Sequence, residues 1–239
     1  MALVSWIGRR VAGIARRSGF PLYATIRGPG PVRGIRMELE GARLRQLSGR
    51  HEPGVQNCIA ERLRPGACFI DVGADVGFFS LLAARLAGPG GRVVAIEPVP
   101  ASADLIKANA TLNRFENVTI VTAAAGAVNR TGAMVQAHRP VPVLTVDGLV
   151  SHLDLPPPDM VRIDVEGAEV EVLAGMSNTL WRHHPDILFE IAASGADDAA
   201  SRYTKMSEAL THYGYAVRRI EDAYPEEGKA VIHGIGVFE

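Results

Sequence analysis

The feature that most limits the folds open to this 239-residue chain is a regular alternation of apolar strands with helical segments. Strands separated by helices in this way form βαβ units, which place the strands parallel in one sheet. We therefore predict an α/β, Rossmann-like fold with a mostly parallel sheet and helices on both faces. The predicted strands cover residues 67–72, 92–96, 118–123, 160–165, 187–191, 216–220 and 231–238, and the predicted helices cover residues 55–63, 77–86, 101–113, 168–173 and 203–213.

Two further segments do not follow this alternation. Residues 126–146 break the rhythm, and we expect an irregular hairpin insertion there, whereas residues 32–47 are expected to hold short strands. The turn-rich sequence Gly-Pro-Gly-Pro at residues 28–31 separates the latter from the start of the chain. We therefore divide the chain into an N-terminal basic arm and lead-in, residues 1–50, and one domain, residues 51–239.

The first twenty residues contain four arginines, and apolar residues recur among them at helical spacing. This pattern predicts a basic amphipathic helix. The apolar run is too short and too charged for a transmembrane helix or a secretory signal. We expect the helix to pack on its own domain or on a second subunit of a homo-oligomer, and contact with a membrane surface is the less favoured alternative.

The overall composition, 47% hydrophobic and 21% charged, is that of an ordinary globular protein. Because the net charge is −1, no basic field predicts nucleic-acid binding. The chain has two cysteines, Cys58 and Cys68, and no cluster of cysteine and histidine has the spacing of a zinc site. The low cysteine count fits the reducing cytoplasm, where we expect the protein to be located.

A glycine-rich string, Asp-Val-Gly-Ala-Asp-Val-Gly over residues 71–77, lies where the first predicted strand gives way to a helix. Gly73 permits a tight turn and a close approach of a ligand to the backbone, and Gly77 opens the helix without a side chain. A helix N-terminus offers free N–H groups and a partial positive charge, which suit a carboxylate or phosphate. The spacing is not the Gly-x-Gly-x-x-Gly of dinucleotide folds, and a tight structural turn is an alternative explanation for the string.

The next predicted strand ends in an acid, Glu97, which is followed by Pro98. Glu97 lies 20 positions after Gly77. An acid at about this distance from a glycine-rich loop is placed to accept both hydroxyls of an adenosine ribose. A solvated glutamate at a strand end is the alternative, and the glycine-rich string upstream favours the ribose role.

Further acids follow the later strands. The string Asp-Val-Glu-Gly-Ala-Glu occupies residues 164–169, and Glu190 closes the strand after it. Because ligands bind outside the carboxyl ends of parallel strands, Asp164 and Glu190 are expected to face the same crevice as the glycine-rich string. Glu166 and Glu169 are predicted to share a helical face. Glu169 is alternatively an acid of the first helical turn, where the helix dipole favours it.

These strings, with Thr-Val-Asp at residues 145–147 and Leu-Ala-Gly at residues 173–175, resemble the FkbM family of methyltransferases over about residues 52–190. The string at residues 164–169 is the most specific part. The resemblance implies a class I methyltransferase fold, S-adenosylmethionine as cofactor, and methyl transfer mostly to oxygen, often on sugars and natural products. It implies that the cofactor is bound by Asp71, Gly73, Ala74, Asp75, Gly77, Glu97, Pro98 and Asp164. It places the candidate catalytic residues Asp164, Glu166 and Glu190 near the reacting centre.

Some positions depart from the family's pattern. Asp75 stands where the family usually has Asn. Both tolerate a left-handed backbone, but Asp adds a negative charge where the carboxylate of the methionine moiety is expected. The usual Thr-Leu-Asp has Val146 in its middle. The loop at residues 123–126 offers no evident side chain for adenine, so backbone groups are expected to contact it. Mostly small residues follow Glu190, which leaves the acceptor undetermined.

A sugar hydroxyl is a poor nucleophile, so a carboxylate base or a bound metal is expected to assist its methylation. Asp164 and Glu190 are the candidates for either role, as the base or as ligands of Mg²⁺. A carboxylate on a small-molecule acceptor would need no base. The alternative functions are an NAD-dependent oxidoreductase and a non-catalytic cofactor-binding module. His51 and Glu52, just upstream, either cap the crevice or simply begin a helix.

Overall fold

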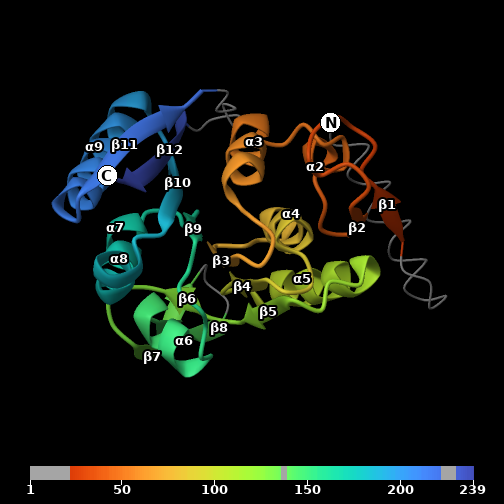
Figure 1. Cartoon of the computed structure of the whole chain (residues 1–239), viewed down its shortest axis with the longest axis horizontal. Helices are drawn as coiled ribbons and strands as arrows, with labels where there is room; N and C mark the ends of the chain where they lie inside the picture. The colour runs from red at the N-terminus through yellow and green to blue at the C-terminus, as the bar shows by residue number, and fades with distance from the viewer. Residues whose placement is uncertain (1–21, 136–138, 222–229) are drawn as a thin grey trace.

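The protein, described here by a computed structural model over residues 22–135, 139–221 and 230–239, is built around a seven-stranded sheet. Its strands are β3 (Cys68–Val72), β4 (Arg92–Ile96), β5 (Val118–Val121), β9 (Met160–Ile163), β10 (Asp186–Ala193), β11 (Tyr215–Ile220) and β12 (Ala230–Phe238). Their order across the sheet is β11-β12-β10-β9-β3-β4-β5 (Figure 1). β12 is antiparallel to both neighbours, and the other neighbouring strands are parallel. The predicted α/β fold with a mostly parallel sheet is confirmed.

Helices cover both faces of this sheet, because successive side chains of each strand point to opposite faces. Phe69 and Met160 belong to the core that includes α3 and α4, whereas Ile70 and Val161 belong to the core that includes α7, α8 and α9. Burial on both faces explains why the strands are continuous apolar runs. The helices are α2 (Leu44–Leu47), α3 (Pro53–Arg62), α4 (Phe78–Ala87), α5 (Pro100–Asn113), α6 (Val146–His152), α7 (Glu169–Ala174), α8 (Ser177–His183) and α9 (Ala196–His212).

The described part of the lead-in packs on the same core. Its strands β1 (Tyr23–Thr25) and β2 (Arg36–Glu38) pair with each other. Asn109 on α5 accepts a hydrogen bond from the backbone N–H of Glu38 at 2.7 Å and donates one to the carbonyl of Val76 at 3.0 Å. The lead-in is thereby tied to the glycine-rich loop, while the domain boundary at residue 50 stays a prediction. The basic helix predicted over residues 1–20 lies outside the described residues.

Several predicted elements differ from the observed ones. The hairpin expected within residues 126–146 is confirmed as β7 (Arg130–Val135) and β8 (Arg139–Leu144), and β6 (Ala124–Ala125) joins β8. α9 begins seven residues before the predicted start. Its first turn consists of small and acidic residues, so no apolar periodicity marks it in the sequence. Acids there are favoured by the helix dipole. Within the described part of the chain, no helix is long and apolar enough to cross a membrane.

The glycine-rich loop lies wedged between the ends of two neighbouring strands. The backbone N–H of Gly73 donates to the carbonyl of Ile96 at 2.9 Å, and that of Asp164 donates to the carbonyl of Val72 at 2.9 Å. Gly73 has a φ of +82°, and a Cβ there would lie 1.8 Å from the backbone oxygen of Asp164. Both the backbone conformation and the close approach of β9 therefore require glycine.

We predict that Gly73→Ala destabilises the protein far more than Gly66→Ala does. Gly66 also has a positive φ, +87°, but nothing lies within 4 Å of its missing Cβ. The control should cost about 1–2 kcal/mol for its left-handed backbone, whereas Gly73→Ala should cost more than about 3 kcal/mol because the strand ends must separate. Urea unfolding followed by circular dichroism measures both, and equal losses would contradict the close approach.

Candidate functional site

A cavity of about 620 Å³ opens at the carboxyl ends of β3, β4, β9 and β10. The chain runs from β3 to β4 and β5 on one side, then crosses to β9 on the other side of β3. Such a switch in strand direction is where open α/β sheets bind ligands. His51 and Glu52 just before α3, the first residues of α4 and the segment 123–125 complete the walls. The cavity lies at the edge of the sheet where the sequence predicted the site.

One end of the cavity is formed by Glu97 and the glycine-rich loop. The Glu97 carboxylate accepts hydrogen bonds from the backbone N–H groups of Asp75 at 2.9 Å and Val99 at 2.8 Å. Burial raises the pKa of Glu97 to about 7. Asp75 has a left-handed φ of +47°, which turns its N–H toward Glu97. Ala74, Asp75, Glu97 and Pro98 all line the cavity, as does Gly73.

Asp71 and Gly77, also expected at the cofactor, stand behind the cavity wall. Neither belongs to the described residues that line the cavity. Asp71 is fully buried, and it accepts a hydrogen bond from Ser80 Oγ at 2.6 Å and pairs with Arg162 at 3.0 Å. At Gly77 a Cβ would lie 3.1 Å from the side chain of Ile106. The geometry therefore favours indirect roles for both, through Arg162 and through helix packing.

Arg162, which none of the sequence motifs indicated, is the central cation of the site. Its guanidinium contacts Asp71 at 3.0 Å and Asp164 at 2.5 Å, and it lies 4.3 Å from the ring centre of Phe79. Burial opposes its charge, but the carboxylates of Asp164 and Asp71 outweigh burial and raise the pKa of Arg162. A basic residue inside an apolar strand, two positions before an acid on the same face, is the signal that could have revealed it.

Asp164 stands where the two ends of the cavity meet. Its side chain is 30% exposed, so it faces the cavity although Arg162 holds one of its oxygens. Burial raises the pKa of Asp164 to about 7, and the neighbouring guanidinium opposes that shift. Asp164 is thus the predicted site residue that both ends of the cavity share.

Behind the other end of the cavity lies a second buried cation, His233, which contacts the lining residues Glu52 and Glu190. The register of β10 and β12 places it opposite Glu190, and its Nε2 lies 2.8 Å from Glu190 Oε2 and 3.2 Å from Glu52 Oε2. The contact with Glu52 lacks hydrogen-bond alignment, so we regard it as an ion pair. Burial disfavours the charge of His233, but the two carboxylates outweigh it and raise its pKa to about 9. At neutral pH an imidazolium therefore lies between two carboxylates.

The same cluster is where a metal could be considered. Among the described residues, ligand atoms of Glu52, Glu190 and His233 lie within 4.8 Å of one another, and Asp164 does not belong to this group. Asp164 and Glu190, the predicted metal candidates, are instead paired with separate protein cations. Because His233 already balances the carboxylates, we interpret the cluster as an ion-paired one, and the requirement for Mg²⁺ stays a question for experiment.

Glu166 and Glu169 do not share a helical face, so that prediction is wrong. α7 begins at Glu169, and Glu166 lies in the preceding loop, where it lines the cavity. Glu169 accepts a hydrogen bond from the backbone N–H of Gly167 at 3.0 Å and pairs with Arg202 at 2.8 Å. The alternative interpretation, an acid of the first helical turn, is the correct one. Its ion pair with α9 holds the loop that carries Asp164.

This fold is that of class I S-adenosylmethionine-dependent methyltransferases, and solved structures share it. The precorrin-6y C5,15-methyltransferase of Geobacter metallireducens is 22% identical with a TM-score of 0.55, over 84% of this chain and 95% of that chain. The FkbM methyltransferase of Methylobacillus flagellatus is 18% identical with a TM-score of 0.53, over 82% of this chain and 55% of that chain.

The sequence comparisons are more specific. Residues 71–217 match the methyltransferase FkbM domain. The hexuronic acid methyltransferase AglP of Haloferax volcanii is 26% identical over 201 residues, which cover 75% of this chain and 80% of that protein. The chain belongs to the FkbM methyltransferase family, as its motifs predicted. An NAD-dependent oxidoreductase and a non-catalytic module are thereby set aside.

We predict that the affinity for S-adenosylhomocysteine rises with pH up to about 7 and then levels off. Ribose hydroxyls donate hydrogen bonds, which favour the ionised carboxylate of Glu97. Because its pKa in the free protein is about 7, binding below that pH must release a proton. Glu97→Gln cannot ionise and should bind more weakly with a flatter pH profile. Calorimetry in buffers of different ionisation enthalpy measures both, and parallel profiles for the two proteins would contradict the assignment.

Proposed function

We propose that this protein transfers a methyl group from S-adenosylmethionine to a hydroxyl oxygen of a sugar or a similar natural-product acceptor. The observation that carries the proposal is a single cavity with two chemically different ends. The end at Glu97 suits a nucleoside, and the end at Glu190 is rich in carboxylates. Carboxylates only accept hydrogen bonds, so they are suited to hold the hydroxyl donors of a polyol.

The residues at the first end fit the cofactor. Glu97 is 6% exposed, and its remaining acceptor capacity points to the cavity rather than to bulk water. The walls at Ala123, Ala124 and Ala125 are small, and they leave room for a flat base. When bound there, S-adenosylmethionine would supply an electrophilic methyl group. In this proposal Glu97 holds the ribose, and Gly73, Ala74, Asp75 and Pro98 shape the loop around the rest of the cofactor.

The residues at the second end would hold the acceptor. Asp164, Glu166 and Glu190 line this part of the cavity, and two of them are fixed by buried cations. Fixed carboxylates orient a hydroxyl without the entropy cost of ordering a mobile side chain. We propose that these carboxylates act on the acceptor, and that the acceptor is a small molecule rather than a nucleic acid.

A carboxylate acceptor is the second candidate. It is favoured by the likeness to a protein named as a hexuronic acid methyltransferase. The charge of the cavity argues against it, because Glu52, Asp164 and Glu190 would repel an anionic group in a partly desolvated site. The hydroxyl is therefore the favoured target, and a uronic acid remains compatible as a sugar whose hydroxyl is methylated.

A paired acceptor screen tests this proposal. The protein is incubated with S-adenosylmethionine and either methyl glucoside or methyl glucuronide, and methylated products are detected by mass. A product that resists mild alkali is an ether and supports hydroxyl transfer, whereas an alkali-labile product is an ester and supports the second candidate. No methylation of any glycoside in a wider panel would overturn the sugar assignment. The cytoplasmic location and the homo-oligomer stay predictions.

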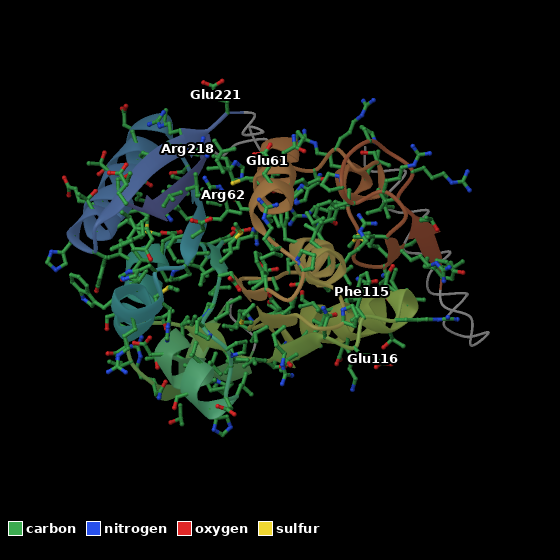
Figure 2. The ribbon with its side chains drawn as sticks, in the orientation of Figure 1. Glu61, Arg62, Phe115, Glu116, Arg218 and Glu221 are labelled. Atoms are coloured by element: carbon green, nitrogen blue, oxygen red, sulfur yellow. The ribbon has the colours of Figure 1, made fainter. Side chains whose placement is uncertain are left out.

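We predict that Asp164→Asn and Glu190→Gln lower the turnover more than the cofactor affinity. Hydrogen bonds to charged groups contribute about 1.5–3 kcal/mol, so each change should lower kcat/KM about 10- to 100-fold. Affinity for S-adenosylhomocysteine, measured by calorimetry, should change about twofold at most. The matched control is Asp186→Asn, at the opposite end of β10, where Asp186 pairs with Arg62 at 2.8 Å (Figure 2 labels Arg62 on α3). Equal loss of cofactor affinity and rate would assign these carboxylates to the cofactor instead.

We also predict that EDTA leaves the activity of the parent protein unchanged. His233 and Arg162 already supply the positive charge that a metal would bring to these carboxylates. The rate of S-adenosylhomocysteine formation is compared before and after chelation and after Mg²⁺ is added back. Loss on chelation with recovery on Mg²⁺ would show that the activity requires a metal.

A further inference from the structure

We propose that His51, oriented by Glu52, is the general base that takes the proton from the acceptor hydroxyl. The inference rests on the proposed function, since it presumes a hydroxyl acceptor. His51 lies upstream of the residues that match the family, which begin at residue 71. Neither His51 nor Glu52 was among the predicted catalytic residues.

The position of His51 is fixed from several sides. The residue lines the cavity immediately before α3. Its ring lies 5.1 Å from Phe78 in an edge-to-face arrangement and 5.7 Å from Phe79. Its backbone carbonyl accepts a hydrogen bond from the buried side chain of Gln56 at 2.5 Å, and Gln56 also donates to the carbonyl of Gly49. These contacts hold the imidazole of His51 in one orientation.

The two ring nitrogens of His51 have different surroundings. Nε2 lies 3.1 Å from Oε1 of Glu52. If this nitrogen carries the hydrogen, as its carboxylate neighbour favours, the lone pair belongs to Nδ1, and we assign that nitrogen to the acceptor hydroxyl. A base whose second nitrogen is held by a carboxylate is the arrangement that activates hydroxyl nucleophiles. Glu52 is thus a positioning residue for His51.

Glu52 itself is held at a conformational cost. It has φ and ψ of 45° and 64° and precedes Pro53, and both the side chain and the following proline disfavour this region. Glu52 is only 8% exposed, and its Oε2 is buried with no aligned hydrogen bond. Strained, buried residues of this kind gather at functional sites. In this conformation the carboxylate of Glu52 contacts both His51 and His233.

Burial is the main reason that His51 stays neutral. Burial lowers its pKa, Glu52 and Glu190 act in the opposite direction, and Arg162 and Arg43 add to the lowering. The other oxygen of Glu52 contacts His233, so this carboxylate pairs with two imidazole rings. A neutral imidazole is able to accept a proton near pH 7.

The other candidates for the base are already engaged. Oδ2 of Asp164 contacts the guanidinium of Arg162 at 2.5 Å, and Oε2 of Glu190 contacts His233 at 2.8 Å. Protonation of either carboxylate would weaken its ion pair with the cation that fixes it. We therefore assign the hydrogen bonding of the acceptor to these carboxylates and its deprotonation to His51.

The proton balance of the step is simple. As the acceptor oxygen bonds to the methyl carbon, its O–H bond breaks and the proton passes to Nδ1 of His51. The electron pair of the carbon–sulfur bond stays on sulfur, so the products are the methyl ether and S-adenosylhomocysteine. The Glu52 carboxylate stabilises the imidazolium, which then returns the proton to solvent through the cavity.

A first test needs no acceptor. Long-range ¹H–¹⁵N spectra of the ¹⁵N-labelled protein report the charge and tautomer of each histidine, and the His51→Asn spectrum identifies the signals of His51. We expect a neutral ring at pH 7 with the hydrogen on Nε2. A hydrogen on Nδ1, or an imidazolium at pH 7, would overturn the proposal even if the protein proved to methylate sugars.

A second test uses the glycoside that the acceptor screen identifies. His51→Asn should lower kcat about 10²- to 10⁴-fold, the usual contribution of a general base. It should also remove the fall in kcat at low pH, while the affinity for S-adenosylhomocysteine stays within about twofold. The matched control is His152→Asn, an exposed position at the end of α6, which should retain the parent rate.

Glu52→Gln separates a positioning role from a structural one. Loss of the carboxylate should move the low-pH fall in kcat to lower pH and reduce kcat less than His51→Asn does, with KM nearly unchanged. A folded His51→Asn protein with the parent kcat would overturn the proposal. If no glycoside is methylated, the proposed function fails, and the tautomer measurement still decides whether His51 has the state that a base requires.

Discussion

The site depends first on the charge of Arg162, which is buried between carboxylates. Asp71 and Asp164 come from neighbouring strands, and without a cation between them their charges would repel each other in a poorly solvated space. The guanidinium also lies over the ring of Phe79 at the start of α4. One side chain thereby joins β3, β9 and the helix that follows the glycine-rich loop. The position of Asp164, which borders both ends of the cavity, follows from this arrangement.

A second buried cation links parts of the chain that are far apart in sequence. His233 on β12 pairs with Glu190 and with Glu52 just before α3, so β12 and the start of α3 meet at the end proposed for the acceptor. The family match covers residues 71–217 and includes neither Glu52 nor His233. The matched region therefore includes the end proposed for the cofactor, whereas flanking segments complete the end proposed for the acceptor. A difference in acceptor between proteins with this core would be expected to arise in those flanks.

The sequence predicted the central strands well because each is an apolar run bounded by turns. Burial on both faces makes such a run continuous, so its limits can be read from the sequence. The starts and ends of helices were harder. α9 begins with an acidic turn that has no apolar period, and the short helices α6 and α8 carry too few residues to show one. Glu166 and Glu169 were assigned to one helical face because a three-residue spacing cannot reveal that the helix begins between them.

By itself, the sequence determined the fold class, the family and the edge of the sheet where the acids gather, because these follow from local patterns of burial and from motifs in one stretch of chain. Only the tertiary structure decided which acids face the cavity, and it placed Asp71 behind the wall and Arg162 between two carboxylates. It also brought His51, Glu52 and His233 to Glu190. Ion pairs between residues up to 181 positions apart depend on strand order and register, and neither is encoded in any local stretch of sequence.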